Sequence, residues 1–235
     1  MKMKRFSFIF SVLLFVVACG NDTYDAGDGV LSYLRADFAD VRTDASARLF
    51  SVVTDDDERF LLSPPVESGW AITPDSVYRA LVYYDSNAVS WDAEELPSVR
   101  PIAISRVLVP RILSIGELET PPSTDPLTLV GAWKSKNGKY INIELSVKTG
   151  TPEAEDAAHI LGIVINGVTD NADGGKTANV MLTHKRKDMP EYYSVSVYVS
   201  VPVKDVPGGL VIGDSIAVTV NTYDGQKTKT FLFDR

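Results

Sequence analysis

Short runs in which apolar and polar residues alternate fill most of this chain after residue 30. Strict alternation sends successive side chains to opposite faces and is typical of half-buried β-strands. The pattern predicts strands at residues 30–42, 47–54, 59–63, 77–84 and 101–115, and then at 140–148, 159–168, 178–185, 195–203, 216–223 and 229–233. Helical periodicity is nearly absent, because only residues 92–96 could form a helical turn. The sequence therefore predicts an all-β protein.

Turn-forming residues separate these predicted strands. Asn137-Gly138 and Asp224-Gly225 each lie between two strands, and both dipeptides favour tight hairpin turns. The acidic run 55–58 is expected to form a third hairpin loop. Pro64-Pro65 is expected to end its strand, because proline donates no hydrogen bond to a β-ladder. Pro110 predicts a bulge or an edge position in the run that contains it.

The distribution of lysine indicates two domains. No lysine occurs between Arg5 and Lys134, whereas ten lysines occur from Lys134 onward. Two prolines among polar neighbours at residues 116–124 predict a stiff linker. The short strands of residues 30–115 suit a small OB-like barrel. The strands of residues 125–235 predict an antiparallel β-sandwich of two sheets.

The first nineteen residues predict export. A cationic start at residues 2–5 precedes an apolar run of about a dozen residues, which is a signal-peptide core and falls short of the ~20 residues of a membrane-spanning helix. Val16-Val17-Ala18-Cys19 resembles a bacterial lipobox. The resemblance implies a signal peptide at 1–18, cleavage between Ala18 and Cys19, and attachment of acyl chains such as palmitate to the Cys19 thiol.

The segment after the lipobox is predicted to be a lipidated tether, residues 19–29. Cys19 is the only cysteine, so no intramolecular disulfide is possible. Removal of residues 1–18 takes away three positive charges, which changes the net charge from −8 to −11. No aspartate follows Cys19 directly, and similarity to Gram-negative lipoproteins then implies the outer membrane. Which side of that membrane the domains face stays open.

Several short motifs follow one another in a distinctive order along the mature chain. After the lipobox, tether and OB-like region come Asp125-Pro126, Trp133, Tyr140-Ile141-Asn142-Ile143, His159-Ile160-Leu161 and Leu182-Thr183-His184. This order resembles the NigD-like lipoproteins, which implies an OB-like domain followed by a β-sandwich. Lys185-Arg186-Lys187 departs from the family pattern, where an asparagine-containing turn is expected. The family is named for a bacteriocin locus and has no established molecular activity.

Metal and catalytic candidates are sparse. His159 and His184, the only histidines, share strand faces with apolar residues. Each is expected at the core edge, hydrogen-bonded to backbone or to its neighbour, rather than in a zinc site, because zinc needs three or four ligands. The acidic run 55–58 is interpreted as a solvated loop rather than a calcium site. Residues 170–175 fail the EF-hand spacing and are expected to form a glycine-rich connection. No serine–histidine–acid set or positioned carboxylate pair is evident.

Aromatic residues supply the remaining candidates for binding. Tyr83, Tyr84 and Trp91 are predicted to form a binding surface in the first region, and Tyr192-Tyr193 follows a basic turn in the second. The acidic first region disfavours nucleic acid. We therefore expect no enzyme, cofactor or metal, but an outer-membrane lipoprotein that binds an envelope protein, peptide or glycan. The alternatives are an immunity-type protein that sequesters a bacteriocin-like peptide and an accessory to a polysaccharide-acting enzyme.

Overall fold

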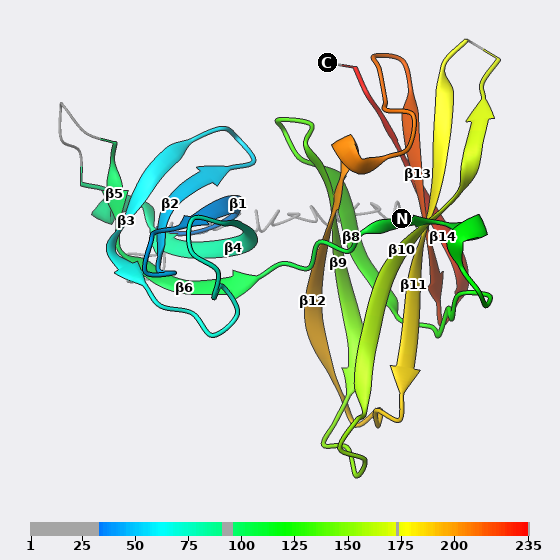
Figure 1. Ribbon diagram of the computed structural model, residues 1–235, viewed down its shortest axis with the longest axis horizontal. Helices are drawn as coiled ribbons and strands as arrows, with labels where there is room; N and C mark the ends of the chain where they lie inside the picture. Colours follow the sequence, from blue (N-terminus) through cyan, green and yellow to red (C-terminus); the bar gives the residue numbers. More distant parts are fainter. Residues whose placement is uncertain (1–32, 91–95, 173, 235) are drawn as a thin grey trace, which may run out of the picture. The chain divides into compact units, whose positions relative to one another are not determined.

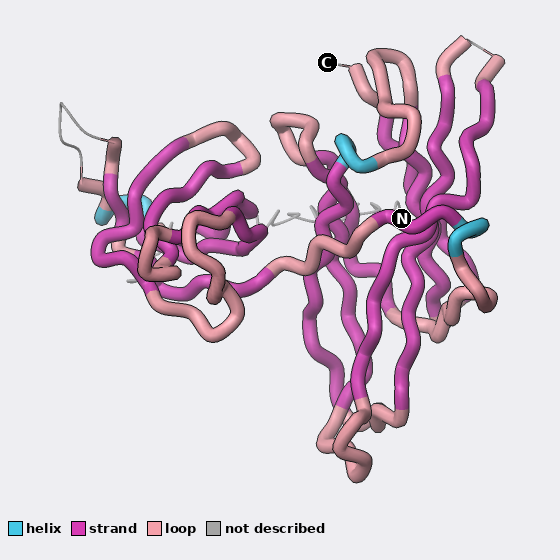
Figure 2. The backbone as a smooth tube through the Cα atoms, viewed as in Figure 1, coloured by secondary structure: helices cyan, strands magenta, loops and turns pink. Residues whose placement is uncertain are grey.

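The computed structural model describes three stretches of the chain, residues 33–90, 96–172 and 174–234. In these stretches nearly every element is a β-strand (Figures 1 and 2). The helical segments in them are three-residue 3₁₀ turns, namely η1 (Ser86–Ala88), η2 (Ile115–Glu117) and η3 (Val203–Asp205). No helix in this part of the chain is long and apolar enough to cross a membrane. The predicted all-β class is confirmed.

The first sheet is curled and has six strands. Its strand order is β5-β3-β2-β1-β4-β6, and all neighbours pair antiparallel except β3 and β5. The strands are β1 (Leu34–Thr43), β2 (Leu49–Thr54), β3 (Arg59–Val66), β4 (Val77–Asp85), β5 (Ser98–Val99) and β6 (Pro101–Arg106). Its concave side encloses a core of fully buried side chains that includes Val41, Leu49, Val52 and Val82. This arrangement agrees with the predicted OB-like barrel.

β3 runs further than the sequence predicted. Pro64 and Pro65 lie inside the strand, which continues to Val66. The register of β2 against β3 shifts between Leu49 and Ser51, opposite the prolines. On its other side, β3 pairs with the two-residue strand β5 only through Leu61 and Leu62. The prolines are tolerated because the ladder is irregular at that point and needs no N–H donor from them.

The remaining strands form two sheets that share one core. The five-stranded sheet has the order β14-β13-β11-β10-β7, and the three-stranded sheet has the order β12-β9-β8. Their bounds are β7 (Ile112–Ser114), β8 (Thr128–Lys134), β9 (Tyr140–Thr149), β10 (Ala158–Asp170), β11 (Lys176–Lys187), β12 (Tyr193–Pro202), β13 (Ser215–Thr222) and β14 (Gly225–Leu232). The two sheets constitute the predicted β-sandwich.

Alternation along β9 shows why these residues form a sandwich. Ile141, Ile143, Leu145 and Val147 are at most 1% exposed and point into the space between the sheets. They meet buried residues of the other sheet, including Val180, Leu182, Ile216 and Val218. Burying each such side chain contributes about 1.5–3 kcal/mol, so the period-2 pattern specifies both the strand and its inward face.

The sandwich also contains parallel pairs, which the sequence did not predict. β11 pairs parallel with β13, because β12 lies between them in the chain but belongs to the opposite sheet. The predicted strand at residues 101–115 is two strands separated at Pro110. Its second part, β7, pairs parallel with β10 in the five-stranded sheet. The domain boundaries at residues 116–124 stay a prediction.

Both glycine hairpins occur where the sequence predicted them. Gly138 has a φ of 70° in the turn between β8 and β9, and Gly225 has a φ of 100° where β14 begins. These positive φ values favour glycine, since other residues rarely adopt them. The acidic run also joins two strands, with Asp57 at a φ of 60° between β2 and β3. Local turn chemistry therefore determines all three hairpins.

Candidate functional site

The predicted surface of Tyr83, Tyr84 and Trp91 is only partly described. Tyr83 and Tyr84 are consecutive residues of β4, so their side chains point to opposite faces. Tyr84 is 2% exposed and packs on Phe60, with the ring centroids 5.0 Å apart. Burial and the bond its hydroxyl donates to Asp37 (2.6 Å) raise the pKa of Tyr84. Tyr84 is thus a core residue, Tyr83 is half-buried, and Trp91 lies outside the described residues, as do Ala18 and Cys19.

All four acidic side chains of loop 55–58 form ion pairs. The prediction of a solvated loop is therefore wrong at one position, Asp55. Each carboxylate of this loop lies beside a cation: Asp55 beside Arg79, Asp56 beside Lys136, Asp57 beside Lys139 and Glu58 beside Arg35. The side chain of Asp55 is only 14% exposed, whereas that of Asp57 is 63% exposed. Within the described ranges, no group of three or more His, Cys, Asp or Glu side chains could hold a metal ion.

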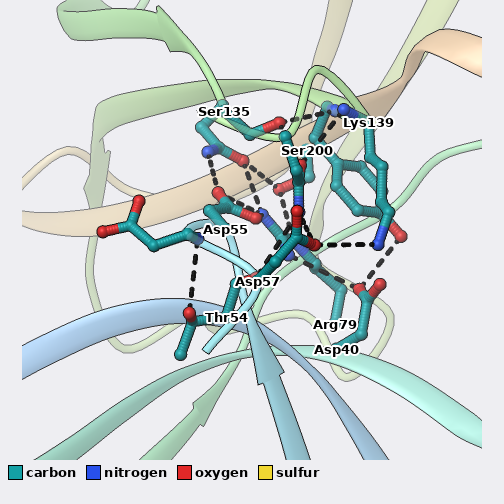
Figure 3. Close-up of polar contacts among 12 residues, drawn as sticks. Asp40, Thr54, Asp55, Asp57, Arg79, Ser135, Lys139 and Ser200 are labelled. Carbon is teal, nitrogen blue, oxygen red and sulfur yellow. Dashed lines mark hydrogen bonds and ion pairs between the residues drawn. The ribbon is translucent and has the colours of Figure 1, made fainter. Parts of the chain in front are cut away.

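Arg79 is the centre of a buried polar network between the first sheet and the sandwich (Figure 3). Its side chain is 2% exposed, and its Nη2 donates to both carboxylate oxygens of Asp55 at 2.7 Å. Nη2 also donates to Asn142 Oδ1 (3.1 Å), Nη1 to Asp40 Oδ1 (3.4 Å) and Nε to Ser200 Oγ (3.2 Å). Residues of three strands, β1, β9 and β12, and of one loop therefore converge on one guanidinium.

The partners of Arg79 also bond to one another. Asn142 donates to Asp55 Oδ2 and accepts from the Ser200 hydroxyl, both at 2.7 Å. The Tyr140 ring lies 4.0 Å from the guanidinium carbon, and its hydroxyl donates to Asp40 at 3.0 Å. Burial and the Asp40 charge raise the pKa of Tyr140 to about 12. Because these groups are engaged with one another, the network joins two sheets and is not an open ligand site.

Sequence reasoning missed this network, although two signals were present. Arg79 is a charged residue inside the apolar run of β4, where residues 79–82 are all buried. Asn142 is 0% exposed and interrupts the otherwise apolar start of β9. A strand that buries successive residues is covered on both faces, so a polar residue on the second face needs a partner there. The partner itself comes from another sheet and has no local signature.

The two histidines are hydrogen-bonded to each other. His159 Nδ1 lies 3.0 Å from His184 Nε2, and His184 Nδ1 lies 3.0 Å from the Asp125 carbonyl oxygen. A carbonyl can only accept, so His184 donates from Nδ1 and accepts at Nε2 from His159. His159 Nε2 then carries no proton and can only accept a hydrogen bond. It has no hydrogen-bond partner in the part of the chain that the structure describes.

This arrangement predicts acid sensitivity at His159. Burial, His184 and Arg186 lower the pKa of His159 from its usual 6.5. As the pH falls below 6.5, the unfolded chain therefore binds the proton before the folded protein does, and stability decreases. His159→Gln should reduce this loss, measured as the change in melting temperature between about pH 8 and pH 5. Equal pH dependence in the two proteins would contradict the expectation.

A cluster of exposed tyrosines lies at one end of the sandwich, which we call the loop end: loops 150–157 and 188–192 and the turn 223–224. Tyr192, Tyr193 and Tyr223 are 79%, 56% and 43% exposed. Loops 150–157 and 188–192 lie together below β9–β12 in Figure 1. A cavity of about 540 Å³ lies between them, lined by Thr151, Glu153, Ala154, Arg186, Asp188, Met189, Pro190 and Tyr192.

Ion pairs hold the loop end in place. Arg186, from the basic triplet Lys185-Arg186-Lys187, pairs with Glu191. The Tyr223 hydroxyl donates to Glu191 Oε1 at 3.0 Å, and the Lys148 ammonium lies 4.4 Å from the Tyr223 ring centroid. Burial and the bond to Glu191 raise the pKa of Tyr223. These contacts link both sheets and hold the Tyr223 ring and the loop residue Glu191 in place.

Gly150 determines where the Tyr192 ring rests. A Cβ at residue 150 would lie 2.6 Å from Tyr192 Cδ2 and 2.8 Å from Pro190 Cγ. Gly150→Ala should therefore displace the exposed Tyr192 ring while changing the free energy of unfolding by less than about 1 kcal/mol. The measurement is nuclear Overhauser contact between residue 150 and the Tyr192 ring, together with a melt. Gly69→Ala, which meets nothing within 4 Å, is the control and should leave both unchanged.

A family model supports the sandwich. The model of the NigD-like C-terminal β-sandwich domain matches residues 115–233. It covers the four interior strands β9, β10, β11 and β13 and the whole loop end. No curated protein matches the chain.

Solved structures share the fold of the described chain. A NigD-like immunity protein from Bacteroides caccae is 18% identical, with a TM-score of 0.62 over 85% of this chain and 97% of that one. A candidate toxin-related protein from Parabacteroides distasonis is 17% identical, with a TM-score of 0.59 over 86% and 93%. A candidate lipoprotein from Bacteroides fragilis is 10% identical, with a TM-score of 0.60 over 86% and 98%.

Proposed function

Because this chain belongs to the NigD-like family, we propose that it is a non-catalytic lipoprotein, anchored to the outer membrane through Cys19, that binds a polypeptide partner at the loop end. The observation that carries the proposal is the set of exposed tyrosines around the loop-end cavity. Tyrosine, methionine and arginine are enriched at protein interfaces, and Tyr192, Met189 and Arg186 line this cavity.

The geometry of the loop end supports binding in two further ways. Loops at one end of a β-sandwich are a common recognition site, because a rigid core positions them. The contacts of Arg186, Glu191 and Tyr223 with one another and with Lys148 order the site before a partner arrives. A pre-formed site loses little conformational entropy on binding.

Site-directed photo-crosslinking in intact cells tests this function. A photoreactive residue in place of Tyr192 should give a discrete covalent adduct. The matched control is the same residue in place of Ile102, which is 61% exposed on the first sheet. The same adducts at both positions, or none at residue 192, would contradict the proposal. Recovery of a glycan rather than a polypeptide at residue 192 would refute the partner class.

Protection from a toxic peptide is a second candidate function. It is favoured by the neighbour from Bacteroides caccae that is described as a NigD-like immunity protein. In this case the loop end would sequester the peptide at the cell surface. Deletion of the gene should sensitise cells to at least one member of a bacteriocin panel, and restoration with a Tyr192→Ala variant should not protect them. Unchanged sensitivity across the panel would remove the support for this role.

A further inference from the structure

β12 has an open edge next to the loop end. It is an outer strand of its sheet and pairs only with β9 among the described strands. On its other side, the Leu108 N–H donates to the Tyr198 carbonyl (3.0 Å), and the Leu108 carbonyl accepts from the Ser200 N–H (2.8 Å). Alternate residues direct their backbone groups to the same edge, so Ser194 and Ser196 face this edge too.

The edge beyond Leu108 is unoccupied in the described part of the chain. The outward N–H and C=O groups of Ser194 and Ser196 have no hydrogen-bond partner there, and both residues are exposed. Leu108 thus behaves as a single residue of an added strand, and it shows that the edge accepts one. Unpaired groups in a regular row are a ready template for a further strand.

β12 also lacks the features that protect other edges. Proteins block open edges with charged residues, proline or short strands. β14 carries Lys227 and Lys229, and β8 ends in Lys134. β12 contains no charged residue, and its single proline is its last residue, Pro202. Val195 remains 38% exposed on it. An uncharged, unprotected edge of this length is suited to pairing.

We propose that an extended segment of the partner polypeptide adds to this edge as an extra strand along residues 193–197, and that it places a side chain in the loop-end cavity. The inference rests on the proposed function and specifies how the partner binds. Tyr192 directly precedes the strand and lines the cavity, so the two sites are continuous. Main-chain bonds then supply affinity, and the cavity supplies specificity.

The size of the edge favours a peptide over a second copy of this chain. The free edge spans five residues, which is about 16 Å. A stable protein pair usually buries about 1,600 Å², which five residues of edge pairing between two copies do not reach. A short extended segment needs less area, because the cavity adds a second point of attachment.

Hydrogen exchange on the full chain tests the strand addition. The probes are linear peptides selected from a random phage-displayed library on the purified, lipidated protein in detergent. A bound peptide should slow exchange of the Ser194, Ser196 and Tyr198 amides by about tenfold or more, while the Val195 and Val197 amides, which face β9, should not change. N-methylation of alternate peptide residues should abolish binding, and methylation of the residues between them should not.

Substitutions separate this inference from the proposed function. Ser196→Pro removes only an outward N–H, so it should keep the fold and weaken peptide binding by about tenfold or more. Ser196→Ala is the matched control and should bind normally. If Tyr192→Ala abolishes binding but Ser196→Pro does not, the edge proposal fails and the loop-end function stands. If neither variant matters, or no peptide is selected, both fail. Concentration-dependent protection of Ser194 without peptide would indicate a second copy and overturn the proposal.

Discussion

Arg79→Ala is expected to destabilise the protein by about 3–5 kcal/mol, a large part of the stability of a domain. The guanidinium is 2% exposed and compensates the carboxylate of Asp55, which is 14% exposed and would remain partly buried without its cation. The substitution also removes one hydrogen-bond donor from Asn142 Oδ1 and one from Ser200 Oγ. Urea unfolding followed by circular dichroism measures the loss.

Two comparisons show whether this effect comes from the buried network. Arg42→Ala changes an exposed arginine of β1 and should alter stability by no more than about 0.5 kcal/mol. The double variant Asp55→Ala/Arg79→Ala should lose clearly less free energy of unfolding than the two single variants lose in sum. The double variant removes both charges of the pair, so neither charge is left without its partner. If Arg79→Ala lowers the free energy of unfolding as little as Arg42→Ala does, the network around Arg79 does not stabilise the protein.

Cys19→Ser is expected to move nearly all of the protein from the membrane fraction to the soluble fraction. The lipobox resemblance implies that acyl chains are attached to the Cys19 thiol, and each CH₂ buried in the membrane would contribute about 0.8 kcal/mol. A serine hydroxyl does not accept the diacylglyceryl group. Fractionation of cells followed by immunoblotting measures the distribution, and metabolic labelling with a palmitate analogue should be lost at the same time.

The matched control for this prediction is Asn21→Ser, which changes the tether and keeps the thiol. It should remain in the membrane fraction. The released Cys19→Ser protein should show the unfolding transition of the parent, because the substitution changes no residue of the two described hydrophobic cores. Retention of Cys19→Ser on membranes after washing without detergent would refute the lipid anchor.

Local patterns in the sequence predicted the elements of this fold well. Alternation marked β9 and its inward face, and Asn137-Gly138 marked the hairpin that precedes it. These features depend on residues a few positions apart, so a single sequence contains them. The sequence also indicated that His159 and His184 need hydrogen-bond partners, because both lie on apolar strands, but the pairing of β10 with β11 decided that they bond to each other.

The candidate surfaces were predicted only in part. Tyr192-Tyr193 drew attention because they follow a basic turn, and both are exposed, whereas Tyr84, which was predicted to form a binding surface, is buried. Which of two adjacent tyrosines faces the core depends on strand register, and a shift of one residue reverses the assignment. The open edge of β12 depends on which strands neighbour it, and that is a property of the sheet.

The sequence by itself thus determined the β class, the hairpins, the family resemblance and the lipid-anchor motif at Cys19, because all of these are encoded in short spacings. Only the tertiary structure decided that Asp55 is a partly buried partner of Arg79 and not a solvated loop residue, and that Asn142 and Ser200 complete their network. It also assigned β7 to the sheet of β10. These contacts join residues far apart in the chain, and packing of whole sheets, rather than any local preference, brings them together.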